Sequence, residues 1–311
     1  MRFFAPMSDI AATARVSRPL WGVFWMLVTG ASFVAVTALV KLVGDGIPPA
    51  QSAFLRYAMG LVLVLPMFLP VFKARLSRRA LTLFGLRGAF HTFGVILWFY
   101  AMTQIPVAEV TAMNFLNPIY VTLLAAVLLG ERLAIRRILA ILVAFAGALV
   151  ILRPGLREVG PGHIAMLFTA DSFAGGYLIA KIMADEVAPT VVVGMLSLTV
   201  TIGLAPFAWA VWVEPTWAEI GWLFLVAVFA TLGHYTMTLA FAAAPLAVTQ
   251  PVTFVQLIWA TLVGAILFDE PADLYVILGG GLIIAAISYI TMREALLRRR
   301  QMTPAVSQTK L

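Results

Sequence analysis

The sequence predicts an all-α membrane protein in which ten transmembrane helices form a five-plus-five inverted repeat. Three observations lead to this fold class: the composition, a series of long apolar segments and an internal repeat. The chain has 311 residues, of which 62% are hydrophobic and 11% are charged, and its mean hydropathy is +1.01. A soluble domain carries about 25% charged residues, so the charges here are too few to cover a water-exposed surface.

Apolar segments long enough to cross a bilayer follow one another along almost the whole chain. A transmembrane helix needs roughly 20 predominantly apolar residues. The connections at 103–106 and 243–245 are very short, so the helices that they join must be antiparallel neighbours. We expect helices near residues 20–42, 50–72, 81–103, 107–129, 135–153, 162–184, 190–212, 218–241, 246–268 and 274–292.

Lys and Arg residues concentrate in the loops on one side of these helices. With the N-terminus in the cytoplasm, the inner side collects the basic clusters at 2–18, 73–79, 132–137 and 293–310. The positive-inside rule then predicts a multi-pass protein of the bacterial cytoplasmic (inner) membrane with both termini cytoplasmic. Residues 1–19 form a cytoplasmic N-terminal segment, and residues 293–311 form a basic cytoplasmic tail. This asymmetry accounts for the net charge of +7 without nucleic-acid binding.

The two halves of the chain, residues 20–153 and 162–292, resemble each other. The shared features are a Thr–Ser–Phe–Lys spacing, a proline before the fourth helix and a glutamate after it. They align Thr29, Ser32, Phe33 and Lys41 with Thr169, Ser172, Phe173 and Lys181, Pro106 with Pro245, and Glu131 with Glu270. Each half has an odd number of helices, so the second half must be inverted relative to the first. Inverted repeats place a binding site near the bilayer midplane and let it open alternately to each side.

Several stretches of the sequence resemble the EamA-type family of the drug/metabolite transporter superfamily. They are Phe54-Leu-Arg56-Tyr57, residues 101–108, Asn117-Pro118 running into residues 129–133, and residues 147–154. The resemblance implies ten helices and transport of metabolites, often amino acids or amine-bearing compounds. We therefore expect a secondary transporter of such a small-molecule substrate, with export favoured over import. Uptake of a cofactor-like metabolite by the same fold is the alternative.

Repeat-equivalent polar residues on the fourth and ninth predicted helices are candidates for the walls of a substrate cavity. Asn114 and Asn117 share one face of the fourth helix, and Thr253 and Gln256 occupy the corresponding face of the ninth. Tyr120 and Trp259 are also repeat-equivalent. Amide and small residues hold transmembrane helices together as well, so a packing role for these positions stays open.

Aromatic and imidazole side chains on two further helices are candidates for the same cavity. His91 and Trp98 fall on one face of the third predicted helix, and His234 lies on the eighth. A histidine beside a tryptophan near the middle of a membrane is typical of an aromatic pocket with one polar contact. A histidine satisfied by packing, with the tryptophan at the lipid interface, is an equal alternative.

Acidic residues inside predicted spans are costly and therefore candidates for function. Asp171 lies near the middle of the sixth helix, where it can bind a substrate amine or carry the coupling proton; a buried structural acid is the alternative. Glu109, at the outer start of the fourth helix, is a candidate for coupling or gating. Arg56 and Arg87 are close enough to helix ends to extend their charges to the membrane surface, so we expect them to be structural or interfacial.

The sequence argues against several other classes of protein. It has no cysteine, and His91, His163 and His234 lie on different predicted helices, so neither a metal site nor a cofactor is expected. It lacks a His-Glu-x-x-His helix and a Walker loop, so an enzyme is not expected. It also lacks the charge rings or repeated filter segment of a channel. The expected partners are a small-molecule substrate and membrane lipid, and the sequence leaves a monomer and a homodimer open.

Overall fold

The structure is a computed structural model that describes residues 18–65, 71, 73–74, 76–129, 134–156, 158–183, 187 and 189–302. Every element within these residues is a helix, which confirms the predicted all-α class. Seven segments are long and apolar enough to cross a membrane, and the helix Thr253–Phe268 is a shorter apolar one. Two further passes, α2 and α8, are not among these segments: the described part of α2 is shorter, and that of α8 is more polar.

The first half of the chain forms five passes through the bundle. The helices are α1 (Pro19–Val43), α2 (Pro49–Leu63), α4 (Arg78–Gln104), α5 (Val107–Asn114) with α6 (Asn117–Leu129), and α7 (Ile135–Leu152). A short turn, η1 (Gly44–Gly46), follows α1. Because α5 and α6 form a single broken pass, the described helices of this half agree with the predicted count.

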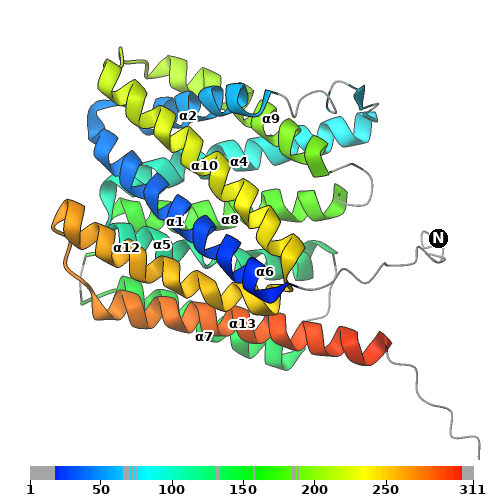
Figure 1. The fold of residues 1–311 in the computed structure, drawn as a ribbon. Coiled ribbons are helices and arrows are strands. Elements are labelled where there is room, and N and C mark those ends of the chain that lie inside the picture. Colours follow the sequence, from blue (N-terminus) through cyan, green and yellow to red (C-terminus); the bar gives the residue numbers. More distant parts are fainter. Residues whose placement is uncertain are drawn as a thin grey trace, which may run out of the picture.

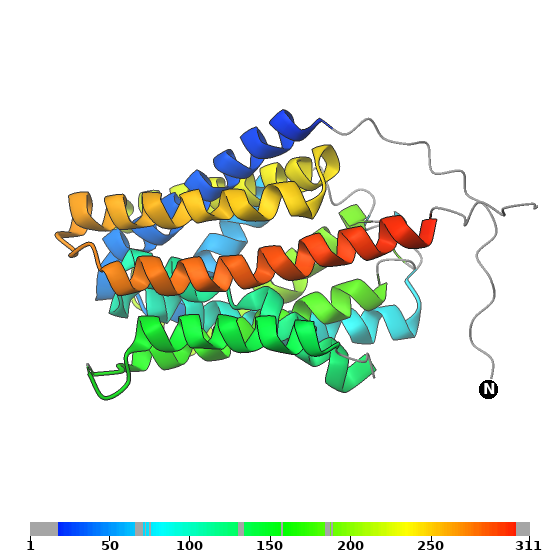
Figure 2. The ribbon, with the colours of Figure 1, turned by 90° about the horizontal axis from the view of Figure 1, so that it is seen from below.

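The second half repeats this order of elements. The helices are α8 (Pro161–Met183), α9 (Pro189–Ala210), α10 (Trp217–Ala243), α11 (Leu246–Thr249) with η3 (Gln250–Val252) and α12 (Thr253–Phe268), and α13 (Leu274–Met302). The start of α1 and the end of α13 lie at the same end of the bundle (Figures 1 and 2). An even number of passes requires this arrangement.

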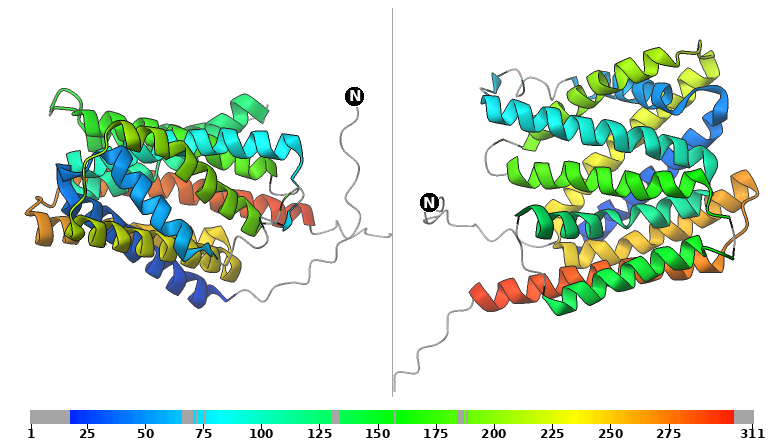
Figure 3. Two further views of the ribbon diagram at one scale, coloured as in Figure 1. Left: turned by 90° about the horizontal axis from the view of Figure 1, so that it is seen from above. Right: turned by 180° about the vertical axis from the view of Figure 1, so that it is seen from behind.

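The packing of the helices follows the internal repeat. Helix α1 packs along α10, and its repeat equivalent α8 packs along α4. Helices α7 and α13, which are also equivalent, lie side by side at one edge of the bundle (Figure 3). The backbones of α7 and α13 approach each other so closely that a Cβ at Gly147 would lie 2.6 Å from the Gly279 carbonyl oxygen. Small residues at such crossings are how membrane helices gain contact.

The fourth and ninth passes are interrupted, although the sequence analysis predicted continuous helices over 107–129 and 246–268. Residues 115 and 116 form a turn between α5 and α6, and η3 separates α11 from α12. A proline follows or lies within each break: Pro118 and Pro251 have no N–H to donate to the carbonyl four residues earlier. Broken helices are tolerated in membranes where they border a cavity, so the breaks direct attention to the space between these two passes.

Candidate functional site

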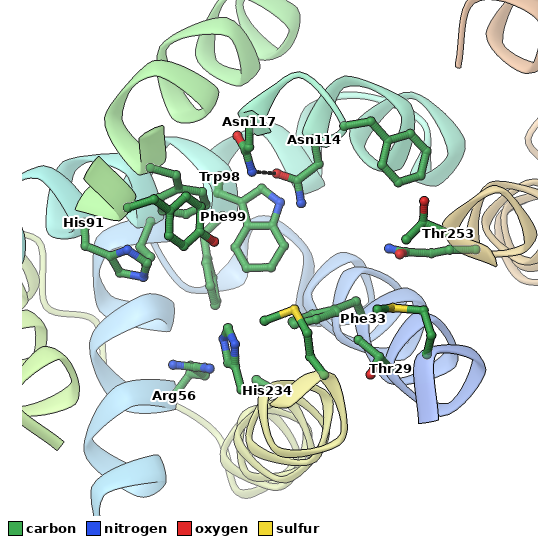
Figure 4. A pocket seen from close by; sticks show the side chains of 18 of the residues that line it. Thr29, Phe33, Arg56, His91, Trp98, Phe99, Asn114, Asn117, His234 and Thr253 are labelled. Carbon is green, nitrogen blue, oxygen red and sulfur yellow. Dashed lines mark hydrogen bonds between the residues drawn. The ribbon is translucent and has the colours of Figure 1, made fainter. Parts of the chain in front are cut away.

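A cavity of about 190 Å³ lies between the two halves, bordered by both broken passes and by α1, α2, α4, α8 and α10. This volume is far above the ~10–15 Å³ that one water molecule needs. Eight of the 20 residues that line it are Phe, Tyr or Trp, and polar side chains lie among them (Figure 4). The cavity residues are Met26, Thr29, Phe33, Arg56, Tyr57, His91, Val95, Trp98, Phe99, Asn114, Phe115, Asn117, Phe173, Tyr177, Ala230, His234, Met237, Phe241, Thr253 and Gln256.

The break between α5 and α6 places two amides at the cavity. The Asn117 Nδ2 donates to Asn114 Oδ1 at 2.9 Å, as the dashed line in Figure 4 shows. The Asn117 Oδ1 is buried and has no hydrogen-bond partner among the described residues. A buried acceptor left unpaired is costly, so Asn117 brings an unsatisfied polar group to the lining of the cavity. Thr253 and Gln256, at the start of α12, line the same cavity.

Two histidines face the cavity from α4 and α10. The His91 Nε2 and the Tyr57 hydroxyl are 2.9 Å apart, and the His91 ring stacks on Phe173 with centroids 4.6 Å apart. The His234 ring meets Phe33 edge to face at 5.2 Å. Each imidazole is therefore held against the phenylalanine of the Thr–Ser–Phe motif from the opposite half of the chain.

Trp98 and Arg56 provide hydrogen-bond donors at the same cavity. The indole of Trp98 packs edge to face against Phe173, with centroids 6.1 Å apart, and its Nε1 is buried without a partner. The Arg56 guanidinium lies over the Tyr57 ring at 4.0 Å, and the residue is only 9% exposed. The expectation that Arg56 extends its charge to the membrane surface is therefore wrong. Arg87 is buried too, and its Nη1 donates to the Val192 carbonyl oxygen at 2.9 Å.

The structure brings seven of the candidate residues together at the cavity: His91, Trp98, Asn114, Asn117, His234, Thr253 and Gln256. The other three candidates for substrate binding, Tyr120, Trp259 and Asp171, do not line it. Tyr120 packs against Phe145, with ring centroids 5.8 Å apart. Trp259 packs with Val34 and Val107 in a separate apolar cluster.

Asp171 is also outside the cavity lining, and it is exposed in the isolated chain. The reason is its position on α8, where Phe173 is the residue that faces the cavity. Two residues along a helix turn the side-chain direction by roughly 200°. Asp171 therefore lies on the opposite face of α8, within electrostatic range of Tyr120.

Glu109 is buried at one end of the bundle rather than at the cavity. It is 3% exposed, and its carboxylate lies 2.6 Å from the Nε2 of His163 on α8. The pair connects α5 to α8, so the structure places this coupling or gating candidate at a contact between the two halves. Among the described residues, no group of three acidic or histidine side chains could hold a metal ion.

Sequence reasoning missed several of the cavity residues, above all Arg56, Tyr57, Phe173 and Tyr177. The position of Arg56 contained a usable signal, because it lies seven residues beyond Pro49, at which α2 begins. Seven residues of helix span about 10 Å, which is deep for a charge that must reach the surface. The repeated Thr–Ser–Phe spacing marked Phe173 as a shared position but gave its side chain no direction, since apolar spans contain aromatic residues on every face.

A multi-pass helical bundle with a cavity between two repeated halves defines a class, that of the secondary transporters. The chain belongs to the EamA-like transporter family, whose family model matches residues 20–153 and 160–292. The fold and the family together make it a membrane transporter of a small metabolite and not an enzyme. The two matched segments confirm that the chain contains two copies of one unit.

Characterised relatives are transporters of different metabolites. A riboflavin transporter of Vibrio cholerae is 27% identical over 91% of this chain and 97% of its own length. An S-adenosylmethionine uptake transporter of Rickettsia bellii is 24% identical over 88% of this chain and 94% of its own length. A pseudopaline exporter of Pseudomonas aeruginosa is 26% identical over 85% of this chain and 94% of its own length.

A solved structure supports the fold. A crystal structure of a protein that is 20% identical aligns over 94% of this chain and 100% of its own, with a TM-score of 0.59. At this level of identity the likeness concerns the fold alone.

Proposed function

We propose that this chain is a secondary transporter that carries a small metabolite with a planar heteroaromatic group across the bacterial inner membrane by alternating access. In this proposal both termini are cytoplasmic, as the distribution of Lys and Arg predicts. The cavity between the two halves holds the substrate near the bilayer midplane. Its two broken passes supply polar groups there, as the broken helices of other transporters do.

The walls of the cavity favour a planar substrate. Four of its lining residues, Phe33, Trp98, Phe115 and Phe173, offer aromatic faces and edges, which pack best against another ring. Riboflavin and S-adenosylmethionine, the molecules named for two of the relatives, each contain a fused heteroaromatic ring system. This supports a cofactor-like metabolite.

The charges at the cavity argue against an amine as the main recognition element. None of the described residues that line it is Asp or Glu, whereas an ammonium group taken out of water needs a carboxylate or several acceptors around it. The expectation of an amine-bearing substrate came from the family resemblance, and Asp171, the candidate partner for such an amine, does not line the cavity. We therefore favour the heteroaromatic class over amines.

One observation carries the proposal: two residues that line the same cavity, Trp98 and Asn117, each have a buried polar atom, Nε1 and Oδ1, that has no hydrogen-bond partner among the described residues. One is a donor and the other an acceptor, which is the pair that the edge of a heteroaromatic ring satisfies. A protein that used the cavity only for packing would be expected to pair or remove such atoms.

Flux into vesicles that contain the purified protein tests the proposal. The panel consists of riboflavin, S-adenosylmethionine, nicotinate and lysine, each with and without imposed proton and sodium gradients. We expect gradient-dependent movement of at least one heteroaromatic compound and none of lysine. Vesicles without protein, and vesicles with Asn117→Leu, are the controls. Movement of lysine alone would overturn the proposed substrate class, and no movement of any compound would overturn the proposed transport.

The proposed orientation has its own test. Reporter fusions after residue 130 and at the C-terminus should report a cytoplasmic location, and a fusion after residue 157 should report a periplasmic one. A periplasmic C-terminus would contradict the proposed topology.

A further inference from the structure

The cavity contains one permanent charge, and that charge is positive. Of the described residues that line the cavity, Arg56 alone is always ionised, and none is acidic. The two imidazoles at the cavity, His91 and His234, are both within electrostatic range of Arg56. Figure 4 shows the Arg56 guanidinium beside His234 at one side of the cavity.

No carboxylate of the described part of the chain compensates this charge. The ion pairs there join Lys41 to Glu270, Arg137 to Glu294, Arg153 to Asp273 and His163 to Glu109. The interaction of Arg56 is with the face of the Tyr57 ring, 4.0 Å from the guanidinium carbon. A ring face attracts a cation, and the guanidinium also donates a hydrogen bond to the Tyr57 hydroxyl, but neither contact supplies a negative charge to balance it.

A buried cation of this kind is costly unless an anion accompanies it. A buried arginine can instead be satisfied by backbone acceptors, as Arg87 is. It too is buried and has no acidic partner among the described residues. Its Nη1 donates to a backbone carbonyl, that of Val192, and it does not line the cavity. Arg87 thus stabilises a contact between α4 and α9, whereas Arg56 faces an open space.

We propose that Arg56 binds an acidic group of the substrate, so that the transported metabolite is an aromatic or heteroaromatic carboxylate. A planar guanidinium donates two parallel hydrogen bonds to a carboxylate, which is the strongest pairing that this side chain makes. Stacking on Tyr57 fixes the plane of the guanidinium, and the ring of the substrate lies between the aromatic walls. The inference rests on the proposed function, because it names the charge of the group that this cavity accepts.

Nicotinate and nicotinamide are matched probes for this inference. They share the pyridine ring and differ in charge, and 3-(aminomethyl)pyridine adds a cation of similar size. Binding is measured by calorimetry and thermal unfolding with the full chain in nanodiscs of neutral phosphatidylcholine, so that no anionic lipid competes. We expect nicotinate to bind about tenfold more tightly than nicotinamide, and the cation to bind more weakly than either.

Variants of the two arginines identify the residue responsible. We expect Arg56→Gln to abolish the preference for nicotinate, Arg56→Lys to retain part of it, and Arg87→Gln to leave it intact. Equal binding of the three probes to the wild type, no binding of nicotinate, or an undiminished preference in Arg56→Gln would each overturn the inference. Arg56→Lys keeps the test decisive if Arg56→Gln does not fold, because a loss of bidentate geometry must lower the preference.

The outcomes separate this inference from the proposed function. A preference for nicotinate that depends on Arg56, without flux of any panel compound, would contradict transport and support the site. Flux of riboflavin with no preference for nicotinate would support transport and contradict the site.

Discussion

Lys41, near the end of α1, forms an ion pair with Glu270, which follows the end of α12, and so joins the two halves of the chain. The Lys41 Nζ also donates to the Ile105 carbonyl oxygen at 3.1 Å. The second carboxylate oxygen of Glu270 accepts from the Val107 backbone N–H at 2.8 Å. The pair therefore holds α1, α12 and the joint between α4 and α5 together, at the end of the bundle opposite the start of α1.

Lys41→Met should open this end of the molecule. The side chains of Lys41 and Glu270 are 20% and 11% exposed. The free energy lost on breaking the ion pair therefore lies between the ~1 kcal/mol of a surface pair and the ~3–5 kcal/mol of a buried one. A change of about 1.4 kcal/mol shifts an open population about tenfold. Because the chain has no cysteine, Met237→Cys in the cavity can report opening through its rate of maleimide labelling.

Arg153→Met is the matched control for this experiment. It breaks the ion pair of Arg153 with Asp273 at the same end of the bundle, but that pair joins the neighbouring helices α7 and α13 away from the cavity. We expect faster labelling of Met237→Cys with Lys41→Met and an unchanged rate with Arg153→Met. Equal rates in both backgrounds would show that the Lys41 pair does not control access.

Two equivalent glycines should differ in their tolerance of a methyl group. A Cβ at Gly94 would lie 2.8 Å from the Phe173 ring, and a Cβ at Gly233 would lie 3.3 Å from the Phe33 ring. We expect Gly94→Ala to lower the free energy of unfolding by ~1–3 kcal/mol and Gly233→Ala to lower it less. Gly85→Ala, with nothing within 4 Å, should raise it by about 0.5–1 kcal/mol. Thermal unfolding in one detergent gives the order, and a reversed order would contradict this account of the packing.

The contacts of these glycines show what the sequence could predict. The alignment of the halves paired Ser32 and Phe33 with Ser172 and Phe173, and in the structure the first two pack on Gly233 and the second two on Gly94. A repeat that survives as the same contact in both halves constrains the fold strongly. The repeat-equivalent Asn117 and Gln256 likewise both border the cavity.

The sequence could not predict how each helix is rotated about its axis. Where a span is apolar on most sides, hydropathy gives no direction, so Asp171 was expected at the cavity and Arg56 at the surface. The sequence also does not show that Glu270 pairs with Lys41, near the end of α1 in the other half. The repeat equivalent, Glu131, lies outside the described residues. The helix breaks were missed because a hydropathy window does not register Pro118 or Pro251.

Trp98→Phe should weaken substrate binding without destabilising the fold. The change retains the aromatic ring and removes the Nε1 donor, which has no partner in the part of the chain that the structure describes, so no hydrogen bond within that part is lost. A neutral hydrogen bond contributes about 0.5–1.5 kcal/mol, which corresponds to a roughly two- to tenfold higher KM for the transported compound. Trp21→Phe, on the exposed side of α1, is the control. An unchanged KM together with a lower unfolding temperature would indicate a packing role.

Asp171→Asn should leave transport intact, although an acid in the middle of a span would ordinarily mark the site. The side chain is on the face of α8 opposite Phe173, so it contacts no substrate in the cavity. A charged residue at the centre of a membrane helix costs roughly 2.5–3.5 kcal/mol on insertion scales, and the amide avoids that cost. We expect KM and maximal flux to match the wild type at every pH, with equal or higher thermal stability.

Asn117→Leu, which removes the unpaired acceptor from the cavity lining, should lose most of the flux in the same assay. If Asp171→Asn abolished flux or its dependence on a proton gradient, Asp171 would have to act from outside the cavity, and the assignment of the transport site to the cavity alone would be wrong.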